Sequence, residues 1–409
     1  MAGLAGLAIE KGFKVTGQDK AYYPPMSDQL KCLGIKENKT EDVINDIKDC
    51  DVVIIGNSQS RGNKAVEFIL DNNLDYYSGP EWIKDNILKD KFVFVVSGTH
   101  GKTTTTSMLI KILQENNCNP SFLLGGIYKE DNISYKNTGS EYFIIEGDEY
   151  DTAFFDKRSK FFHYKPNTLI INNLEYDHSD IFEDIDEIIK QFHFLIRTMS
   201  NNTNIIYNDS DENISSLLSM GLWSKAAPYE KNIKVKNIIG QHNLNNASAA
   251  ISAAKTIGIS KENSILALKK FKGVKRRLEK IDNNNFVLYD DFAHHPTEIS
   301  SSLKTLRDLY PEKKIITFFE IRSNSMIAGT HKNTFLESFK DTNELYIYCK
   351  NNVDWLNKEL NIIFYKDLDI VINKILACAG PKDVVVLMSN GDTSYIIDQL
   401  TIKLKIKKI

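Results

Sequence analysis

Short apolar runs rich in β-branched residues recur along the chain, and each is followed by a turn and a helical pattern. Nearly all of these runs are continuously apolar rather than alternating, which is typical of parallel strands covered on both faces. Helical patterns such as residues 103–116 and 244–258 lie between them. The pattern therefore predicts an α/β protein built of doubly wound domains. The expected strands span residues 14–19, 51–56, 91–98, 141–148, 167–174, 286–292, 314–320, 344–349 and 383–392.

Two polar junctions divide the chain into three expected domains. The first follows a helical pattern over 81–88, and the second falls in the stretch "DNNN" at 282–285. The opening residues predict a helix that ends near Gly12. We therefore expect a Rossmann-like N-terminal domain, a central ATPase-like domain with a phosphate loop, and a Rossmann-like C-terminal domain, over residues 1–89, 90–279 and 280–409.

Composition excludes several classes of protein. A net charge of -3 gives no electrostatic reason to expect a nucleic acid or an anionic membrane as partner. The five cysteines are scattered without a CxxC pair, which argues against a zinc site and a disulfide framework. No apolar run approaches the roughly 18 residues of a membrane span. A cytoplasmic location is the expectation.

The stretch "SGTHGKTTT" at 97–105 predicts a phosphate-binding loop between a strand and a helix. Gly98 and Gly101 let the backbone bend, so that backbone amides and the helix N-terminus face an anion. Lys102 can then reach the β- and γ-phosphates of a nucleotide, and the hydroxyl of Thr103 can bind Mg²⁺. The alternative is a tight strand–helix turn without a ligand. The expected nucleotide-binding residues here are Gly98, Thr99, His100, Gly101, Lys102, Thr103 and Thr104.

Two acidic clusters follow the next two strands. The stretch "EGDEYD" at 146–151 places Glu146 just past a strand end, where a carboxylate could hold a magnesium ion. The stretch "NNLEYDHSD" at 172–180 brings His178 toward the same edge. Either cluster alone is an ordinary solvated turn. Their succession after a phosphate loop favours a metal site formed by Thr103, Glu146 and His178.

Polar residues also surround the Ala-rich helical pattern and the strand expected at 286–292. His242, Asn243 and Asn246 could face an adenine, although a helix cap explains them as well. Arg276 or Arg277 could stabilise charge on a transferring phosphoryl group, or form a basic surface pair. The stretch "YDDFAHHPTEI" at 289–299 places aspartate and histidine pairs before Pro296, which can begin a helix.

Taken together, these stretches resemble the Mur ligase family, the ATP-dependent enzymes that form the amide bonds of the peptidoglycan precursor. "GTHGKTTT", "EGDEYD", "NNLEYDH", "GQHNLNNASAA", "KRRLE" and "DDFAHHPTE" occur in the family's order and approximate spacing. The resemblance spans essentially the whole chain. It implies ATP and Mg²⁺ as cofactors and UDP-N-acetylmuramate as the acid substrate.

The resemblance also implies the reaction and the roles of individual residues. The muramate carboxylate attacks the γ-phosphate of ATP, and an amine then attacks the resulting acyl phosphate. The implied catalytic residues are Lys102, Glu146, His178 and Arg277. Adenine would be held by His242, Asn243 and Asn246, the ribose by Asp291, and the peptide by His295, Arg322, Ser323 and Asn324. His294 is the alternative to His295.

Within the family, the chain resembles the branch that attaches the recovered tripeptide L-alanyl-γ-D-glutamyl-meso-diaminopimelate. The similar stretches are 60–70, 76–82, 151–182, 320–326 and 389–392. The alanine-adding branch carries a His-Arg pair where this chain has Ile321 and Arg322. Two alternatives remain, namely ligation of free L-alanine and a nucleotide-binding protein without ligase activity. A phosphate-loop kinase or partitioning ATPase is disfavoured, because it would need neither the Asn-rich stretch nor "AHHPTE".

The chain departs from the family pattern at several places. The family begins with a strand and a glycine-rich turn for the uridine diphosphate, and this sequence starts beyond them, so that UDP binding is in question. Ile321 stands where a proline is expected, and the wording after Asp392 diverges. His193 occupies the offset of a lysine that is carbamylated in some members, and we therefore expect no carbamate.

Overall fold

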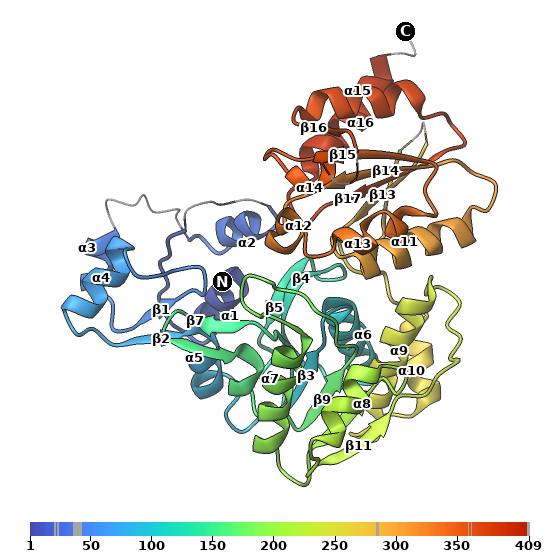
Figure 1. Ribbon diagram of the computed structural model, residues 1–409. Helices are drawn as coiled ribbons and strands as arrows, with labels where there is room; N and C mark the ends of the chain where they lie inside the picture. The colour runs from blue at the N-terminus through green and yellow to red at the C-terminus, as the bar shows by residue number, and fades with distance from the viewer. Residues whose placement is uncertain are drawn as a thin grey trace. The chain divides into compact units, whose positions relative to one another are not determined.

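The protein is an α/β protein whose described part separates into two compact units. The computed structural model describes residues 1–19, 22, 24–35, 43–283, 286–358, 360 and 362–406 (Figure 1). One unit comprises Met1–Asp177, Ile181–Ile238 and Asn243–Lys272. The other comprises His178–Asp180, Ile239–His242 and the described residues from Gly273 onward. The α/β class predicted from the sequence is confirmed.

A seven-stranded sheet forms the centre of the first unit, in the order β11-β10-β9-β3-β6-β4-β5. All neighbouring strands are parallel except β4 and β5, which form an antiparallel edge. The strands span Phe92–Ser97 (β3), Ser121–Tyr128 (β4), Ile133–Lys136 (β5), Tyr142–Gly147 (β6), Thr168–Ile171 (β9), Asn204–Tyr207 (β10) and Lys225–Pro228 (β11). The sequence predicted β3, β6 and β9 and missed the other four.

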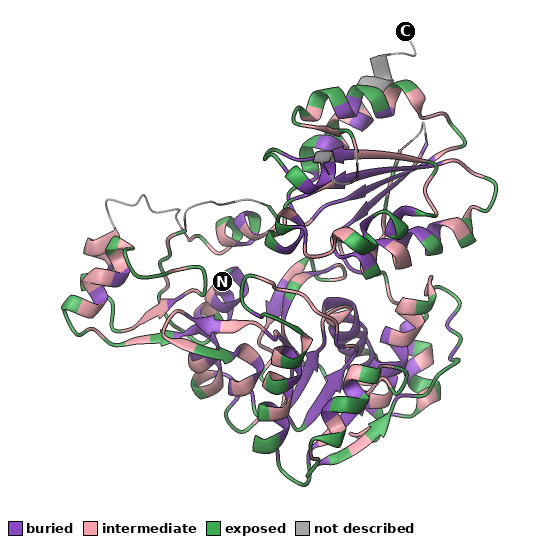
Figure 2. Ribbon diagram, in the orientation of Figure 1, coloured by how far each residue is buried: buried purple, intermediate pink, exposed green. Residues whose placement is uncertain are grey.

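Both faces of this sheet are buried, which explains why its strands are continuously apolar (Figure 2). In β3, Val93 and Val95 enter one core, while Phe94 and Val96 enter the other. The helices of this unit are α6 (Lys102–Glu115), α7 (Ile185–Thr198), α8 (Glu212–Ser219), α9 (Gln241–Lys255) and α10 (Lys261–Leu268). Residues of α7 and α8 line the first core, and residues of α6, α9 and α10 line the second.

The first 90 residues contribute helices and a two-stranded parallel sheet to the same unit. Their elements are α1 (Ala2–Glu10), α2 (Met26–Cys32), α3 (Val43–Lys48), β1 (Val53–Ile55), α4 (Lys64–Asp71), β2 (Tyr76–Ser78) and α5 (Gly79–Asn86). The expected first helix is confirmed, and Gly12 follows it with a φ of 97°. The strand expected at 14–19 is wrong: these residues form only an isolated bridge at Gly17.

An antiparallel hairpin interrupts the chain between β6 and β9. It consists of β7 (Asp151–Ala153) and β8 (Asp156–Ser159), followed by a short 3-10 helix, η1 (Lys160–His163). Only three residues separate the end of β6 from the start of the hairpin. The hairpin therefore restricts the conformation of the acidic stretch that follows β6.

The second unit is built on a six-stranded sheet in the order β12-β13-β17-β14-β15-β16. Its strands are parallel except for β12 at one edge. They span Glu279–Ile281 (β12), Val287–Asp291 (β13), Ile315–Glu320 (β14), Glu344–Tyr348 (β15), Phe364–Tyr365 (β16) and Val384–Met388 (β17). The strands predicted at 286–292, 314–320, 344–349 and 383–392 are confirmed as β13, β14, β15 and β17.

Helices cover both faces of this second sheet, where two separate cores are buried. They are α11 (Pro296–Leu309), α12 (Asn324–Ala328), α13 (Lys332–Phe335), η2 (Glu337–Phe339), α14 (Asp354–Lys358), α15 (Leu368–Cys378) and α16 (Ser394–Ile406). Pro296 begins α11 as predicted. Of the expected junction at 282–285, Asn284 and Asn285 lie outside the described residues. The division into three domains stays a prediction.

Candidate active site

The phosphate loop connects β3 to α6 and requires glycine at two positions. Gly98 and Gly101 have φ values of 124° and 79°, which other residues adopt only with strain. A Cβ on Gly98 would lie 2.9 Å from the carbonyl oxygen of Asn173, and a Cβ on Gly101 would lie 2.4 Å from Oδ1 of Asn246. A side chain at either position would therefore strain the loop.

Backbone amides at the start of α6 are available to an anion. Gly101 is the N-cap of this helix, and its missing side chain makes no capping hydrogen bond. Asn173 fixes the preceding residues, because its carbonyl accepts from the amide of Thr99 at 3.1 Å and its Oδ1 from that of His100 at 2.7 Å. Free helix N-termini of this kind bind phosphate through their amides and the helix dipole.

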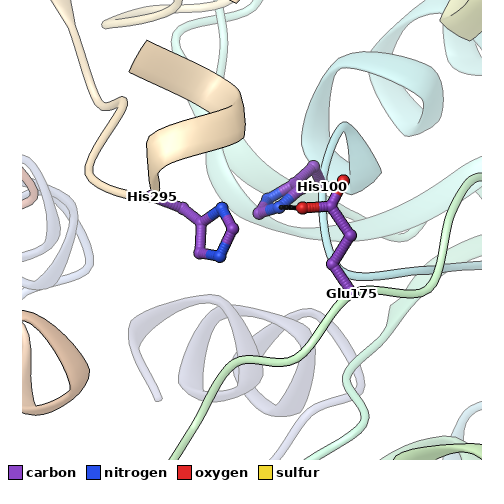
Figure 3. Close-up of side chains that lie close together, drawn as sticks. All are labelled: His100, Glu175 and His295. Carbon is purple, nitrogen blue, oxygen red and sulfur yellow. Dashed lines mark ion pairs between the residues drawn. The ribbon is translucent and has the colours of Figure 1, made fainter. Parts of the chain in front are cut away.

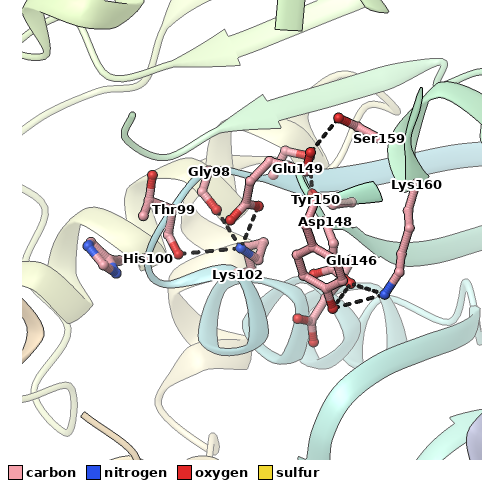
Figure 4. A network of polar contacts seen from close by, with 12 residues as sticks. Gly98, Thr99, His100, Lys102, Glu146, Asp148, Glu149, Tyr150, Ser159 and Lys160 are labelled. Atoms are coloured by element: carbon pink, nitrogen blue, oxygen red, sulfur yellow. Dashed lines mark hydrogen bonds and ion pairs between the residues drawn. The ribbon is translucent and has the colours of Figure 1, made fainter. Parts of the chain in front are cut away.

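Lys102 is the first residue of α6, and its ammonium lies back across the loop (Figure 4). Nζ donates to the carbonyl of Gly98 at 2.7 Å and to Oε2 of Glu149 at 2.9 Å. Burial alone would lower the pKa of Lys102, but the charges of Glu149, Asp148 and Glu146 outweigh it and raise the pKa. Lys102 therefore carries a fixed positive charge at the loop.

Glu146, near the carboxyl end of β6, lies beside the first threonine of α6. The hydroxyl of Thr103 donates to Oε2 of Glu146 at 3.1 Å, and the amide of Gly125 donates to Oε1 at 2.8 Å. Burial, together with the charge of Asp148, raises the pKa of Glu146 to about 7. A divalent cation would stabilise the ionised carboxylate, and a hydroxyl with a carboxylate is a donor pair that suits Mg²⁺. The predicted pair of Thr103 and Glu146 is thus brought together.

A second lysine stabilises Asp148 in the same acidic stretch. Lys160 donates to Asp148 at 3.1 Å and to the hydroxyl of Tyr150 at 2.9 Å, while that hydroxyl donates to Asp148 at 2.8 Å. Burial would raise the pKa of Asp148, but Lys160 and Lys102 lower it on balance. Asp148 is therefore ionised at neutral pH, and its contact with Lys160 on η1 could not be predicted from the sequence pattern.

His100 lies at the outer end of the loop beside Glu175 (Figure 3). Its Nε2 is 3.5 Å from a carboxylate oxygen of Glu175. The backbone amide of Glu175 donates to the hydroxyl of Thr99 at 2.8 Å, and this bond ties the segment of Glu175 to the phosphate loop. His295, also drawn in Figure 3, belongs to the other unit and is described with it.

The asparagines of α9 approach the phosphate loop. Asn246 lies against Gly101, as the close approach of its Oδ1 shows, and its amide is 3.4 Å from Oδ1 of Asn243. His242, in contrast, is assigned to the second unit. Burial lowers its pKa to about 4, so that its ring is neutral at neutral pH. Of the three predicted adenine residues, Asn246 lies at the loop and Asn243 beside it, and the role of all three stays a prediction.

Arg276 and Arg277, adjacent in sequence, differ in how firmly they are held. Arg276 donates to Asp290 at 3.2 Å and to the carbonyl of Ser389 at 2.7 Å. Arg277 lies 3.5 Å from Glu298 and 5.0 Å from the ring centroid of Phe292, and it is the more exposed of the two. Arg276 is therefore a structural residue, whereas Arg277 can meet a ligand. The catalytic role expected for Arg277 stays a prediction.

Asp291 is the last residue of β13, and its side chain is buried. The hydroxyl of Ser302 donates to it at 2.5 Å, and the amide of Leu278 donates at 3.3 Å. Burial raises its pKa to about 6, although the bond from Ser302 and the charge of Arg277 oppose that rise. The carboxylate is hydrogen-bonded to groups of its own unit. Its contact with a ribose stays a prediction.

The two histidines before α11 have different surroundings. His295 is buried, accepts a bond from the amide of Thr297 at 3.3 Å as the helix cap, and packs edge-to-face on His331 at 4.4 Å. His294 is more exposed, and its Nδ1 is 3.5 Å from Glu298. The capping geometry gives His295 a structural role that the sequence-based choice did not include, and His294 is the more accessible ring.

Arg322 follows β14 and is exposed. It passes over Gly391, where a Cβ would lie 2.6 Å from its Nη1. Ser323 is the N-cap of α12, and Asn324 donates to Asp180 at 2.9 Å. Ile321, found where the family resemblance predicts proline, is buried in the core. The predicted peptide residues thus gather at one end of the second sheet.

His178 has a φ of 54° and is assigned to the second unit, whereas Thr103 and Glu146 belong to the first. Its part in a metal site stays a prediction. The sequence analysis gave no role to Lys160, Tyr150 or Asn173. Only the asparagine pair at the end of a strand was a signal that could have revealed one of them.

A parallel sheet with a phosphate loop after its central strand, and a buried lysine and carboxylate at that loop, defines a nucleotide-binding enzyme of the α/β class. The chain belongs to the Mur ligase family, whose members are ATP-dependent ligases that form amide bonds. Family models match the catalytic domain over residues 1–90, the middle domain over 96–222 and the glutamate ligase domain over 276–391.

Similar proteins cover the full length of the chain. The UDP-N-acetylmuramate–L-alanyl-γ-D-glutamyl-meso-2,6-diaminoheptandioate ligase of Haemophilus influenzae is 40% identical, over 100% of this chain and 97% of that protein. The crystal structure of a murein peptide ligase from Psychrobacter arcticus matches with a TM-score of 0.75 and 32% identity, over 98% of this chain and 95% of that one. The UDP-N-acetylmuramate–L-alanine ligase of Clostridium tetani is 30% identical, over 96% and 93%. None of the helices in the described residues is long and apolar enough to cross a membrane.

Proposed function

We propose that the protein joins UDP-N-acetylmuramate to L-alanyl-γ-D-glutamyl-meso-diaminopimelate at the expense of ATP, in the recycling of peptidoglycan. The observation that carries this proposal is full-length similarity to a tripeptide ligase at 40% identity, against 30% for an alanine ligase. The similarity covers all three expected domains, which we propose to bind the nucleotide sugar (1–89), ATP (90–279) and the peptide (280–409).

ATP would bind at the loop formed by Gly98, Thr99, His100, Gly101, Lys102, Thr103 and Thr104. The fixed charge of Lys102 suits the β- and γ-phosphates, and the free amides of α6 suit an adjacent phosphate oxygen. Mg²⁺ would be held by Thr103 and Glu146, with His178 as a further ligand. When bound, the ion neutralises charge on the transferring phosphoryl group.

The remaining roles fall to polar residues of α9 and of the second unit. Asn243, Asn246 and the neutral His242 would hold adenine, and Asp291 the ribose. Arg277 would stabilise charge on the γ-phosphoryl group, for which its weak contact with Glu298 leaves it available. Arg322, Ser323, Asn324 and His295 would form the peptide site, where the guanidinium suits a carboxylate.

The chemistry consists of two displacements that these residues can support by position and charge. The muramate carboxylate oxygen attacks the γ-phosphorus, the bond to the β-phosphate oxygen breaks, and ADP leaves. The free amine of the tripeptide then attacks the acyl carbon and loses a proton. The tetrahedral intermediate expels inorganic phosphate and leaves the amide.

Ligation of L-alanine is the competing function, since the alanine ligases are also similar over most of the chain. The test is ADP release with UDP-N-acetylmuramate and Mg·ATP, after addition of either the tripeptide or L-alanine. Release with the tripeptide alone is expected. Release with L-alanine alone would make the protein an alanine ligase, and no release with either amine would support the alternative of nucleotide binding without ligation.

A further inference from the structure

Glu149 is a buried carboxylate whose contact with the phosphate loop the proposed reaction does not use. Only 2% of its side chain is exposed, and its Oε2 accepts a hydrogen bond from Lys102 at 2.9 Å (Figure 4). It thus holds the ammonium group that is proposed to meet the nucleotide phosphates. A phosphate oxygen bound to Lys102 would share that ammonium with a second anion.

The backbone fixes Glu149 at this position. The residue lies in a three-residue segment between the end of β6 at Gly147 and the start of β7 at Asp151. The hydroxyl of Ser159 on β8 donates to the backbone carbonyl of Glu149, and Asp151 pairs with Ser159 across the hairpin. Because both ends of the segment are anchored to sheets, the backbone holds Glu149 beside Lys102.

The two neighbouring carboxylates have other partners, and they leave Lys102 as the cation for which Glu149 and a phosphate would compete. Asp148 is already occupied by Lys160 and Tyr150, and Glu146 by Thr103 and Gly125. Each of these three carboxylates has its own donors, and Lys102 is the cation of Glu149. An arriving phosphate therefore displaces a charge-assisted hydrogen bond rather than filling an open position.

We propose that Glu149 is a positioning residue that competes with the phosphates of ATP and ADP for Lys102 and thereby limits how tightly the site holds a nucleotide. This inference rests on the proposed binding of nucleotide at the loop. Its consequence is release: a competing carboxylate lowers the affinity for ADP, which must leave in each turnover.

The test is the dissociation constant of Mg·ADP and of Mg·ATP, measured by isothermal titration calorimetry on the full chain. Glu149→Gln keeps the size and a hydrogen-bond acceptor but removes the competing charge. The expected result is about tenfold tighter binding of both nucleotides, equivalent to about 1.4 kcal/mol. A carboxylate with a purely structural role would instead give equal or weaker binding, because Lys102 would lose its support.

Glu130→Gln is the matched control, because it removes a carboxylate from another buried lysine of the same helix. Glu130 pairs with Lys111 of α6 at 2.7 Å, and both side chains are largely buried. Nucleotide affinity should be unchanged in this variant. Any tightening equal to that of Glu149→Gln would mean a general effect of lost charge and would overturn the proposal.

A shorter acid at position 149 provides a second test if the glutamine variant does not fold. Glu149→Asp keeps the charge but draws it away from Lys102 by one methylene, and the expected dissociation constants are two- to threefold below those of the wild type. Unchanged or weaker binding in this variant would overturn the proposal. Failure of the wild type itself to bind nucleotide would contradict the proposed function instead.

Discussion

Glu146 gives a stability prediction whose sign and size follow from its surroundings. Burial and the charge of Asp148 raise its pKa from 4.5 to about 7. The folded state therefore binds this proton more tightly than the unfolded state does. The resulting contribution to the free energy of unfolding is complete below pH 4.5 and is lost as the pH rises through 7. A shift of this size corresponds to about 3 kcal/mol between the two protonation states.

Glu146→Gln removes this dependence while it keeps an oxygen for Gly125 and a polar partner for Thr103. In the presence of a metal chelator, the variant should match the wild type at pH 4.5 and exceed it at pH 8. For a unit of this size, about 3 kcal/mol corresponds to roughly 6 °C or more in the melting temperature. The assay is thermal unfolding at both pH values, followed by circular dichroism.

Magnesium supplies the control for this prediction. Mg²⁺ with ADP should stabilise the wild type at pH 8 by more than it stabilises Glu146→Gln, because a cation offsets the ionised carboxylate. An equal difference between variant and wild type at both pH values would refute the account, since it would show that the buried charge does not determine their relative stability.

Three further substitutions test other parts of the site. Gly101→Ala should raise the dissociation constant of Mg·ADP at least about tenfold and lower the melting temperature, because its φ is 79°; unchanged affinity would contradict the loop geometry. Arg277→Lys should reduce kcat at least about tenfold with little effect on stability, while Arg276→Lys should cost about 1–3 kcal/mol of stability in denaturant unfolding; the reverse pattern would contradict the assignment. Ser302→Ala removes a donor to Asp291, whose pKa is already about 6, so it should destabilise the protein more at pH 8 than at pH 5; equal losses would contradict it.

The sequence predicted the elements whose signal is local. β3, β6 and β9 are continuously apolar because both of their faces are buried, and the phosphate loop is marked by glycines at positions where a side chain would be strained. β4 was missed because Gly125 and Gly126 interrupt its apolar run, and β10 because only its two central residues are buried, whereas all four residues of β9 are. Residues 14–19 have the composition of a strand, but composition does not determine whether another strand lies beside them to pair with.

The site was predictable where both partners lie at strand ends of one parallel sheet, and not where a contact depends on the register of a hairpin or on the path of a short connection. Thr103 and Glu146 were expected together because one follows β3 and the other lies near the carboxyl end of β6, and the two side chains are in hydrogen-bond contact. The contact of Lys160 with Asp148 depends on the register of the hairpin, and the contact of Glu149 with Lys102 depends on the three residues between two sheets. The capping role of His295 likewise follows from where α11 begins.

The central claim, ligation of the tripeptide to UDP-N-acetylmuramate, is tested most directly by a competition experiment. The protein would receive Mg·ATP, UDP-N-acetylmuramate and equal concentrations of the tripeptide and L-alanine, and the products would be separated and weighed by mass spectrometry. The account predicts UDP-N-acetylmuramoyl-tripeptide as the dominant product. A product that contains a single alanine would contradict it.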